Sequence, residues 1–241
     1  MHDVQSGQPD EPQERRLRGH GKRISATLDT VVGKGGAKAK LANSRPNARV
    51  VLLTGPSGCG KSRLASQSGL PKLPLDDFYF DHDHPGLPRR FGIVDWDSPE
   101  TWDAAGAMAA LESLCTTGRA TVPVYSIPTS SRIGEATSEL MGAPLVIAEG
   151  IFAAELVKRC SDAGLLADAI CLTRPRLVSF WFRLVRDLQE RRKPVFTLIR
   201  RGVGLCRGER KQIAHWVQQG CHPLGKRAAI ARIAALAHGA S

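Results

Sequence analysis

The chain has 241 residues, of which 42% are hydrophobic, 24% are charged and 5% are aromatic. This composition is that of a globular protein and excludes collagen-like, fibrous and intrinsically disordered chains. The length suits one α/β domain with an extension and is too short for two full domains. No apolar run approaches the ~20 residues of a membrane-spanning helix and the N-terminus is polar, so we expect a cytoplasmic protein that does not insert into a membrane.

The formal net charge of +11 is concentrated in one segment. Between Arg174 and Lys211, twelve basic residues stand against three acidic ones. Such a segment can bind nucleic acid or another polyanion, so its place in the fold decides its meaning. The six cysteines are scattered, without the spacing of a zinc site, and are expected to be reduced thiols.

Residues 1–47 are polar and basic, and we predict that they form a partly disordered extension ahead of one domain at 48–241. An apolar-periodic stretch at 24–32 predicts a short helix that ends at Gly33. A solvated arm is favoured over a nucleic-acid-binding one, because chain ends generally fray.

The domain opens with a continuous apolar run from Val50 to Thr54, which predicts a strand buried on both faces of a parallel sheet. A helix is predicted after Ser98 as its N-cap, with Pro99 in the first turn and an end before Gly118. Further strands are predicted at 73–76, 144–149 and 169–173. The alternation of strands and helices predicts an α/β fold, with a doubly wound parallel sheet and helices on both faces.

Residues 55–62 match the pattern G-x-x-x-x-G-K-[ST] between a buried strand and a predicted helix. Backbone N–H groups of such a loop hold phosphate oxygens, and the N-terminus of the following helix favours the anion. Lys61 is expected to reach the β- and γ-phosphates, and the Ser62 hydroxyl to bind Mg²⁺. The expected nucleotide-binding residues are Gly55, Pro56, Ser57, Gly58, Cys59, Gly60, Lys61, Ser62 and Arg63.

Two carboxylates stand at the predicted ends of other strands. Asp76 ends the second strand and Glu149 ends the third. Because the carboxyl ends of parallel strands line one crevice, both are expected to face the bound phosphates and metal. Alternation along an extended chain predicts that Asp77 points away from that crevice.

Four segments follow the phosphate-binding loop in a fixed order. They read Asp-Asp-Phe-Tyr at 76–79, Asp-Ser-Pro at 97–99, Pro-Val-Tyr at 123–125 with Ser-Arg at 131–132, and Glu-Gly-Ile at 149–151. An arginine-bearing helical pattern comes next, at about 176–193. With these motifs, residues 49 to about 193 resemble the uridine kinase family of P-loop nucleoside kinases. The resemblance implies a P-loop NTPase fold with a helical, arginine-bearing lid.

The resemblance also implies ATP and Mg²⁺ as cofactors and transfer of the γ-phosphate to a hydroxyl of a small molecule. The implied catalytic residues are Asp76, as general base, with Lys61, Arg183 and Arg186. The implied metal ligands are Ser62, Asp76 and Glu149. The implied acceptor pocket is lined by Tyr79, Asp97, Tyr125 and Arg132.

Ser126 and Ser130 stand where the family commonly has an Asp and a His that take part in nucleoside recognition. The acceptor therefore stays open among nucleosides, sugars and vitamin-like alcohols. Trp96 and Trp102 are expected to belong to the core rather than to a binding surface.

A second function remains open, that of a nucleotide-binding regulatory or nucleic-acid-binding protein with little kinase turnover. The kinase is favoured because the arginine-rich segment overlaps the expected lid. After the lid, the sequence shows no clear final strand, only a basic helical region at about 195–241 with a terminal helix at about 226–238. The preferred nucleotide base and any homo-oligomer are left open.

Overall fold

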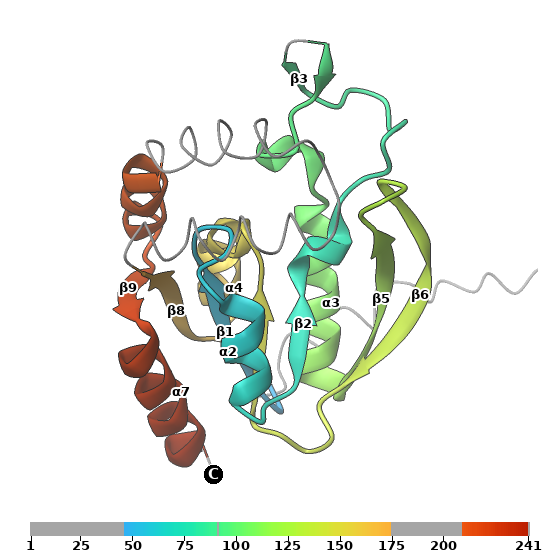
Figure 1. Cartoon of the computed structure of the whole chain (residues 1–241). Coiled ribbons are helices and arrows are strands. Elements are labelled where there is room, and N and C mark those ends of the chain that lie inside the picture. Colours follow the sequence, from blue (N-terminus) through green and yellow to red (C-terminus); the bar gives the residue numbers. More distant parts are fainter. Residues whose placement is uncertain (1–45, 91, 175–208, 241) are drawn as a thin grey trace, which may run out of the picture. The chain divides into compact units, whose positions relative to one another are not determined.

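The computed structural model describes residues 46–90, 92–174 and 209–240. Within these residues a five-stranded sheet has the order β2-β7-β1-β8-β9, and every neighbouring pair is parallel (Figure 1). The strands are β1 (Arg49–Thr54), β2 (Lys72–Pro74), β7 (Leu145–Glu149), β8 (Leu166–Thr173) and β9 (His222–Gly225). The predicted parallel α/β sheet is therefore confirmed.

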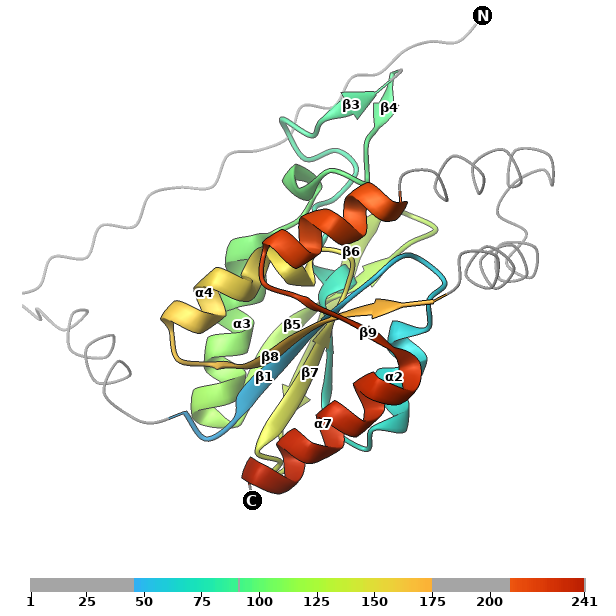
Figure 2. The ribbon, with the colours of Figure 1, turned by 90° about the vertical axis from the view of Figure 1, so that its left-hand side faces the viewer.

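Helices cover both faces of the sheet, as the alternation predicted (Figure 2). Along β1, Val50 and Leu52 join one buried cluster, whereas Val51 and Leu53 join the other. The first cluster is covered by α3 (Ala104–Thr117), α4 (Val157–Asp162) and a helix at 209–218. The second is covered by α2 (Lys61–Gln67) and α7 (Lys226–Ala240).

The sheet has a final strand that the sequence analysis did not find. β9 pairs with β8 from Ile170↔His222 to Thr173↔Gly225. It is four residues long and contains Pro223, so it lacks the apolar run that marks an internal strand. A proline is tolerated in an edge strand, because no neighbouring strand on the open side needs its N–H for a hydrogen bond. The terminal helix predicted after it is confirmed as α7.

The helix predicted to begin at Ser98 begins later. Pro99–Thr101 form a separate 3₁₀ turn, η2, and Trp102 is extended and buried, so the chain bends before the helix. The N-cap is Asp103, whose Oδ1 accepts a hydrogen bond from the Gly106 N–H at 2.8 Å. Ser98 as N-cap was therefore wrong, whereas the end before Gly118 is confirmed.

The second strand is shorter than predicted. β2 ends at Pro74, and Leu75–Phe78 form a 3₁₀ turn, η1. Leu75 and Phe78 are both buried, and their spacing of three residues suits a 3₁₀ turn rather than an alternating strand. Asp76 therefore lies on a turn, and the alternation argument for Asp77 does not apply.

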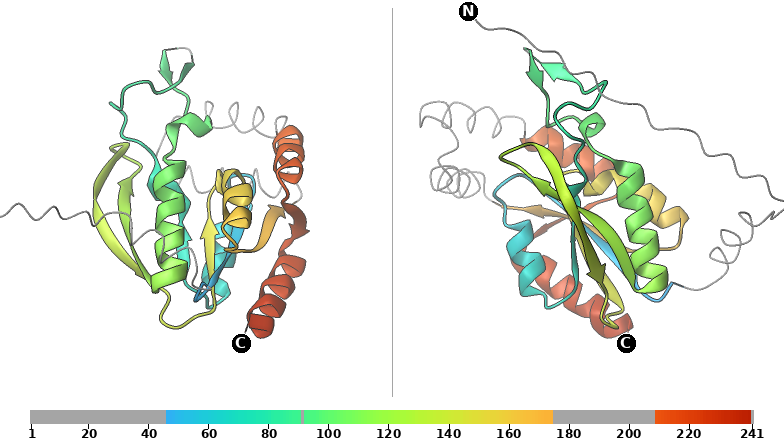
Figure 3. Two further views of the ribbon diagram at one scale, coloured as in Figure 1. Left: turned by 180° about the vertical axis from the view of Figure 1, so that it is seen from behind. Right: turned by 90° about the vertical axis from the view of Figure 1, so that its right-hand side faces the viewer.

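Two hairpins lie outside the sheet. β5 (Arg119–Ser126) and β6 (Ser131–Glu139) form an antiparallel pair that contacts α3 and η1 (Figure 3). The smaller hairpin joins β3 (Arg89–Arg90) to β4 (Ile93–Val94), and a 3₁₀ turn, η3 (Ala153–Leu156), precedes α4.

Some predictions fall on residues that the structure does not describe. The extension and its helix at 24–32, most of the lid at 176–193, and Arg183 and Arg186 lie outside the described residues. The five described cysteines are free and buried. Among the described residues, no helix combines the length and the apolar character needed to cross a membrane.

A buried carboxylate, Asp168, fastens α7 to the sheet through a partly exposed ion pair with Arg232. The Arg232 Nε donates to Asp168 Oδ2 at 2.6 Å, and the Ala169 N–H donates to Asp168 Oδ1 at 2.8 Å. The Asp168 side chain is only 4% exposed. Losing its carboxylate leaves two donors without their acceptor.

We expect Asp168→Ala to lower the free energy of unfolding by about 1–3 kcal/mol, measured by urea denaturation. The control is Asp162→Ala, which removes the exposed Lys158–Asp162 pair on α4 and is expected to change stability by no more than about 0.5 kcal/mol. Equal effects from the two variants would contradict the anchoring role of Asp168.

Candidate functional site

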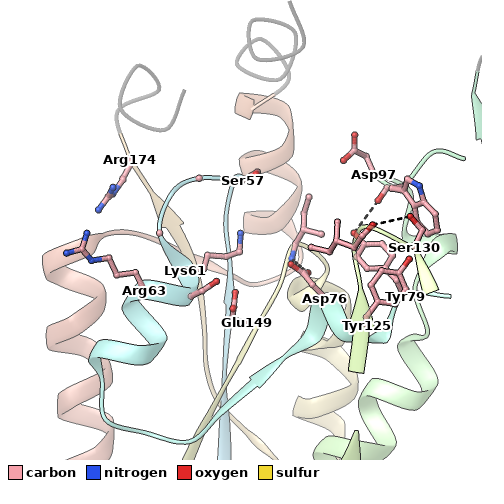
Figure 4. A pocket seen from close by; sticks show the side chains of 16 residues that line it. Ser57, Lys61, Arg63, Asp76, Tyr79, Asp97, Tyr125, Ser130, Glu149 and Arg174 are labelled. Carbon is pink, nitrogen blue, oxygen red and sulfur yellow. Dashed lines mark hydrogen bonds between the residues drawn. The ribbon is translucent and has the colours of Figure 1, made fainter. Parts of the chain in front are cut away.

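A pocket of about 590 Å³ lies at the carboxyl ends of the central strands and reaches toward the β5–β6 hairpin (Figure 4). The loop after β1 and the start of α2 form one end of it, which we call the loop end. That end is lined by Ser57, Gly58, Gly60, Lys61, Ser62, Arg63 and Arg174. The opposite end, which we call the aromatic end, is lined by Tyr79, Trp96, Asp97, Tyr125, Ile127 and Ser130. Asp76, Glu149 and Ile151 also line the pocket.

The loop after β1 has little room for side chains at Gly55. This residue has a φ of +149°, and a Cβ there would lie 2.6 Å from the Leu172 carbonyl oxygen and 3.0 Å from Cys59 Sγ. Gly60, with a φ of +96°, caps α2. Lys61 Nζ donates to the Gly55 carbonyl at 2.8 Å, so its cation lies over the loop. The loop thus has the backbone conformation that a phosphate-binding nest requires.

Glu149 provides a buried carboxylate at the end of β7. Its side chain accepts a hydrogen bond from Ser62, and it interacts electrostatically with Lys61 and Asp76. Burial raises the pKa of Glu149, and the Ser62 hydrogen bond and Lys61 lower it again. The residue itself is 7% exposed.

The donors around Glu149 fit a magnesium ion bound together with phosphates. Mg²⁺ usually takes one or two carboxylates and completes its shell with water and phosphate oxygens. Asp76, Glu149 and the Ser62 hydroxyl supply oxygen donors of this kind in one pocket. Among the described residues, no group of three or more His, Cys, Asp and Glu side chains forms a complete protein-only metal site.

Asp76 is held in place by the turn that follows β7. The Ile151 N–H donates to Asp76 Oδ1 at 3.2 Å, and a Cβ on Gly150 would lie 2.8 Å from the same oxygen. Asp77, by contrast, does not line the pocket; its carboxylate is hydrogen-bonded to the backbone of Tyr125. Burial, chiefly, raises the pKa of Asp77.

The aromatic end is built around Tyr79. Its ring centre lies 5.7 Å from that of Trp96 and 5.8 Å from that of Tyr125, and its hydroxyl donates to the Trp96 carbonyl at 3.2 Å. Burial raises the pKa of Tyr79, and the charges of Asp76 and Asp97 raise it further. A ring-shaped molecule with hydroxyl groups would meet aromatic faces and a carboxylate here.

The structure gathers most of the described candidates from the sequence into this pocket. Gly55, Pro56 and Cys59 belong to the loop without lining the pocket. Arg132 does not line it either; its guanidinium donates to the backbone carbonyls of Phe78 and Tyr79. Trp102 is buried as expected, whereas Trp96 is half-buried and lines the pocket, so placing it in the core was wrong.

Sequence reasoning missed Arg174 as a site residue. It follows the last residue of β8 and lies beside the loop, with its guanidinium 3.7 Å from where a Gly60 Cβ would be. The rule that strand ends line the crevice, applied to the predicted strand at 169–173, would have found it.

The comparisons with known proteins rest on structure. No protein-family model matches the sequence, and the curated proteins contain no match to it. A solved structure described as a "putative fructose transport system kinase", from Silicibacter sp. TM1040, shares 23% identity over 75% of this chain and 91% of its own, with a TM-score of 0.53. The chain has the fold of a P-loop kinase. This likeness confirms the predicted fold class.

Two other kinases are similar at lower TM-scores. A "possible uridine kinase" from Bacillus stearothermophilus shares 20% identity over 64% of this chain and 85% of its own, with a TM-score of 0.40. Phosphoribulokinase from Rhodobacter spheroides shares 12% identity over 70% of this chain and 68% of its own, with a TM-score of 0.43.

The close packing of the P-loop on β8 makes a prediction about Gly55. Gly55→Ala should lower the free energy of unfolding by about 1–3 kcal/mol. Its φ of +149° is strained for alanine, and the new Cβ would lie 2.6 Å from the Leu172 carbonyl oxygen, which is fixed in the sheet. Thermal unfolding measures the change. Gly225→Ala, where a new Cβ meets nothing within 4 Å, is the matched control and should unfold close to wild type.

Proposed function

We propose that this P-loop kinase fold transfers the γ-phosphate of ATP, with Mg²⁺, to a hydroxyl group of a small molecule. The observation that carries the proposal is one continuous pocket with the cationic P-loop at one end, aromatic side chains at the other and the Asp76 carboxylate between them. Phosphoryl transfer requires positioning and electrostatic stabilisation more than covalent participation by the protein. This pocket offers both.

At the loop end, the backbone of the P-loop and Lys61 would hold the β- and γ-phosphates. Ser62, Glu149 and Asp76 would hold the magnesium ion, which supplies charge neutralisation at the phosphate oxygens. The two lid residues Arg183 and Arg186 are proposed to add positive charge at the transferring group and to exclude water.

In the middle of the pocket, Asp76 would accept the proton of the acceptor hydroxyl as the oxygen attacks phosphorus. Its carboxylate is exposed in the pocket, and the Ile151 N–H fixes one of its oxygens. We assign its second oxygen, Oδ2, to the hydroxyl proton. A carboxylate fixed in this way can orient the hydroxyl before transfer.

At the aromatic end, Tyr79, Asp97 and Tyr125 would contact the acceptor. Aromatic faces pack against the apolar side of a ring, and a carboxylate accepts hydrogen bonds from hydroxyl groups. A nucleoside, a sugar or a vitamin-like alcohol combines both features.

The experiment that tests this proposal is a screen of nucleosides, sugars and cofactor precursors for acceptor-stimulated release of ADP from MgATP. Acceptor-dependent release supports the kinase. Steeply salt-dependent binding to RNA or DNA, with no acceptor-dependent release, would instead support a nucleic-acid-binding role.

Asp76→Asn keeps the size of the side chain and removes its charge. We expect turnover to fall by about 100-fold to 10,000-fold, the usual cost of losing an acid–base group, with a much smaller change in ATP affinity. Steady-state kinetics and calorimetry measure the two quantities. Asp77→Asn is the adjacent control, because its side chain lies outside the pocket. Turnover near wild type in Asp76→Asn would remove the assigned base.

The two carboxylates, Asp76 and Asp97, also predict the charge of the preferred acceptor. An anionic acceptor would be repelled from this end of the pocket, so a neutral sugar or nucleoside should show a higher kcat/KM than its phosphorylated counterpart. Asp97→Asn should reduce the ratio of kcat/KM for the neutral acceptor to kcat/KM for the phosphorylated one by about tenfold at low salt, where charges are least screened. A preference for the phosphorylated acceptor in the wild type would contradict this expectation.

A further inference from the structure

Arg132 reaches from the hairpin to the loop that carries Tyr79. In the β5–β6 ladder it pairs with Tyr125, which lines the aromatic end. Its Nε donates to the Tyr79 carbonyl at 3.1 Å, and its Nη2 donates to the Phe78 carbonyl at 3.3 Å. One side chain from β6 thus holds the two backbone carbonyls that flank the Tyr79 Cα.

The same residue contacts the next two positions of that loop. The Arg132 backbone N–H donates to Asp81 Oδ1 at 2.7 Å, and its guanidinium carbon lies 5.8 Å from the centre of the Phe80 ring. Arg132 therefore interacts with each of the four residues 78–81. A single exposed ion pair contributes little to stability, but a network of contacts from one planar group is worth more.

The guanidinium also contacts the beginning of α3. Arg132 Nη2 lies 3.3 Å from Asp103 Oδ2, while the other oxygen of Asp103 caps the helix. A Cβ on Gly106 would lie 2.5 Å from Asp103 Oδ2, so the glycine leaves room for this carboxylate. A glycine inside a helix makes that helix less stable than an alanine would, and at position 106 it permits the contact between Asp103 and Arg132.

We infer that Arg132 is a positioning residue that fixes the loop at 78–81 against the hairpin and α3. It thereby sets the distance between Tyr79 and Tyr125 at the aromatic end, without contacting the acceptor itself. The effect of Arg132 on acceptor binding rests on the proposed function. The brace, by which we mean the contacts of Arg132 that join the loop at 78–81, the hairpin and α3, rests on the structure alone. This differs from the resemblance, which implied that Arg132 lines the acceptor pocket.

An arginine suits this position better than a lysine. The guanidinium is planar, with donors directed to several sides, so it can reach two carbonyls and a carboxylate together. A lysine ammonium keeps the charge but not this arrangement of donors. Comparing the two separates the effect of geometry from that of charge.

The test uses the full chain with Arg132→Lys and Arg132→Met. The control is Arg119→Met, which removes another arginine of the same hairpin, one whose exposed pair with Glu139 has a distance of 3.7 Å. The first measurement is hydrogen exchange without ligands at the Phe80 and His82 amides, which donate to Thr101 and Ser130 across the braced segments. The second is the acceptor KM, together with the affinity for MgATP.

We expect both Arg132 variants to exchange these amides at least about tenfold faster than wild type, with Arg119→Met unchanged. The acceptor KM should rise by about tenfold in both variants, while the MgATP affinity stays within about twofold. Both effects should be smaller in Arg132→Lys than in Arg132→Met. Arg132→Lys should nevertheless differ from wild type in amide exchange and in the acceptor KM.

Three results would overturn the inference. Unchanged exchange in Arg132→Met would show that no brace exists, and a raised acceptor KM with unchanged exchange would show direct contact with the acceptor. Faster exchange with an unchanged acceptor KM would show that the brace does not position the site. If the wild type uses no acceptor at all, the proposed function fails, but the exchange measurement still decides whether the brace exists.

Discussion

The site depends on β1 being buried between two parallel neighbours whose ends are tied to its own. The Gly150 N–H donates to the Leu53 carbonyl at 3.2 Å, and the Thr54 hydroxyl donates to the Ile151 carbonyl at 3.1 Å. On the other side, the loop after β1 packs against the Leu172 backbone of β8. Because these groups are buried and paired, the P-loop cannot move without disturbing the centre of the sheet.

The turn after β7 therefore does more than end a strand. Glu149 supplies a buried carboxylate, Gly150 leaves the space in which Asp76 lies, and the Ile151 N–H fixes one oxygen of Asp76. Asp76 itself belongs to a different segment, the 3₁₀ turn η1. Residues 149–151 thus supply one carboxylate, Glu149, and hold a second one, Asp76, that comes from a separate part of the chain. Both carboxylates line the same pocket as the P-loop.

What the sequence predicted well is what local pattern determines. The P-loop is a contiguous motif between a buried run and a helix, so its strand, turn and helix follow from adjacent residues. Asp76 was placed correctly in the pocket, but for the wrong local reason, since Leu75 and Phe78 are buried on a turn rather than alternating on a strand. β9 escaped notice because edge strands need no apolar run.

Arg132 could not be placed from local pattern at all. It lies in an exposed strand and is separated by 29 residues from Asp103 and by 54 from Phe78. Contacts over such distances depend on how the hairpin packs, and a motif reveals only that an arginine is present. Arg174 is the opposite case. The strand before it was predicted, and what was missing was the step from that strand end to a residue that lines the pocket.

The charges of the pocket have a direction that constrains the proposed reaction. Lys61, Arg63 and Arg174 lie at the loop end, whereas Asp97 lies at the aromatic end, with Asp76 between (Figure 4). In the proposed reaction, a triphosphate would be attracted to the loop end and repelled from the aromatic end, so its direction in the pocket would be fixed.

Its γ-phosphate, however, must approach the carboxylates of Asp76 and Glu149. Burial already disfavours the charged form of Glu149, as the raised pKa records, so a second anion nearby would add to that cost unless a cation lay between them. Ser62 and Glu149 would hold a divalent ion whose charge would offset both penalties, so in the proposed reaction nucleotide and metal should bind as one unit.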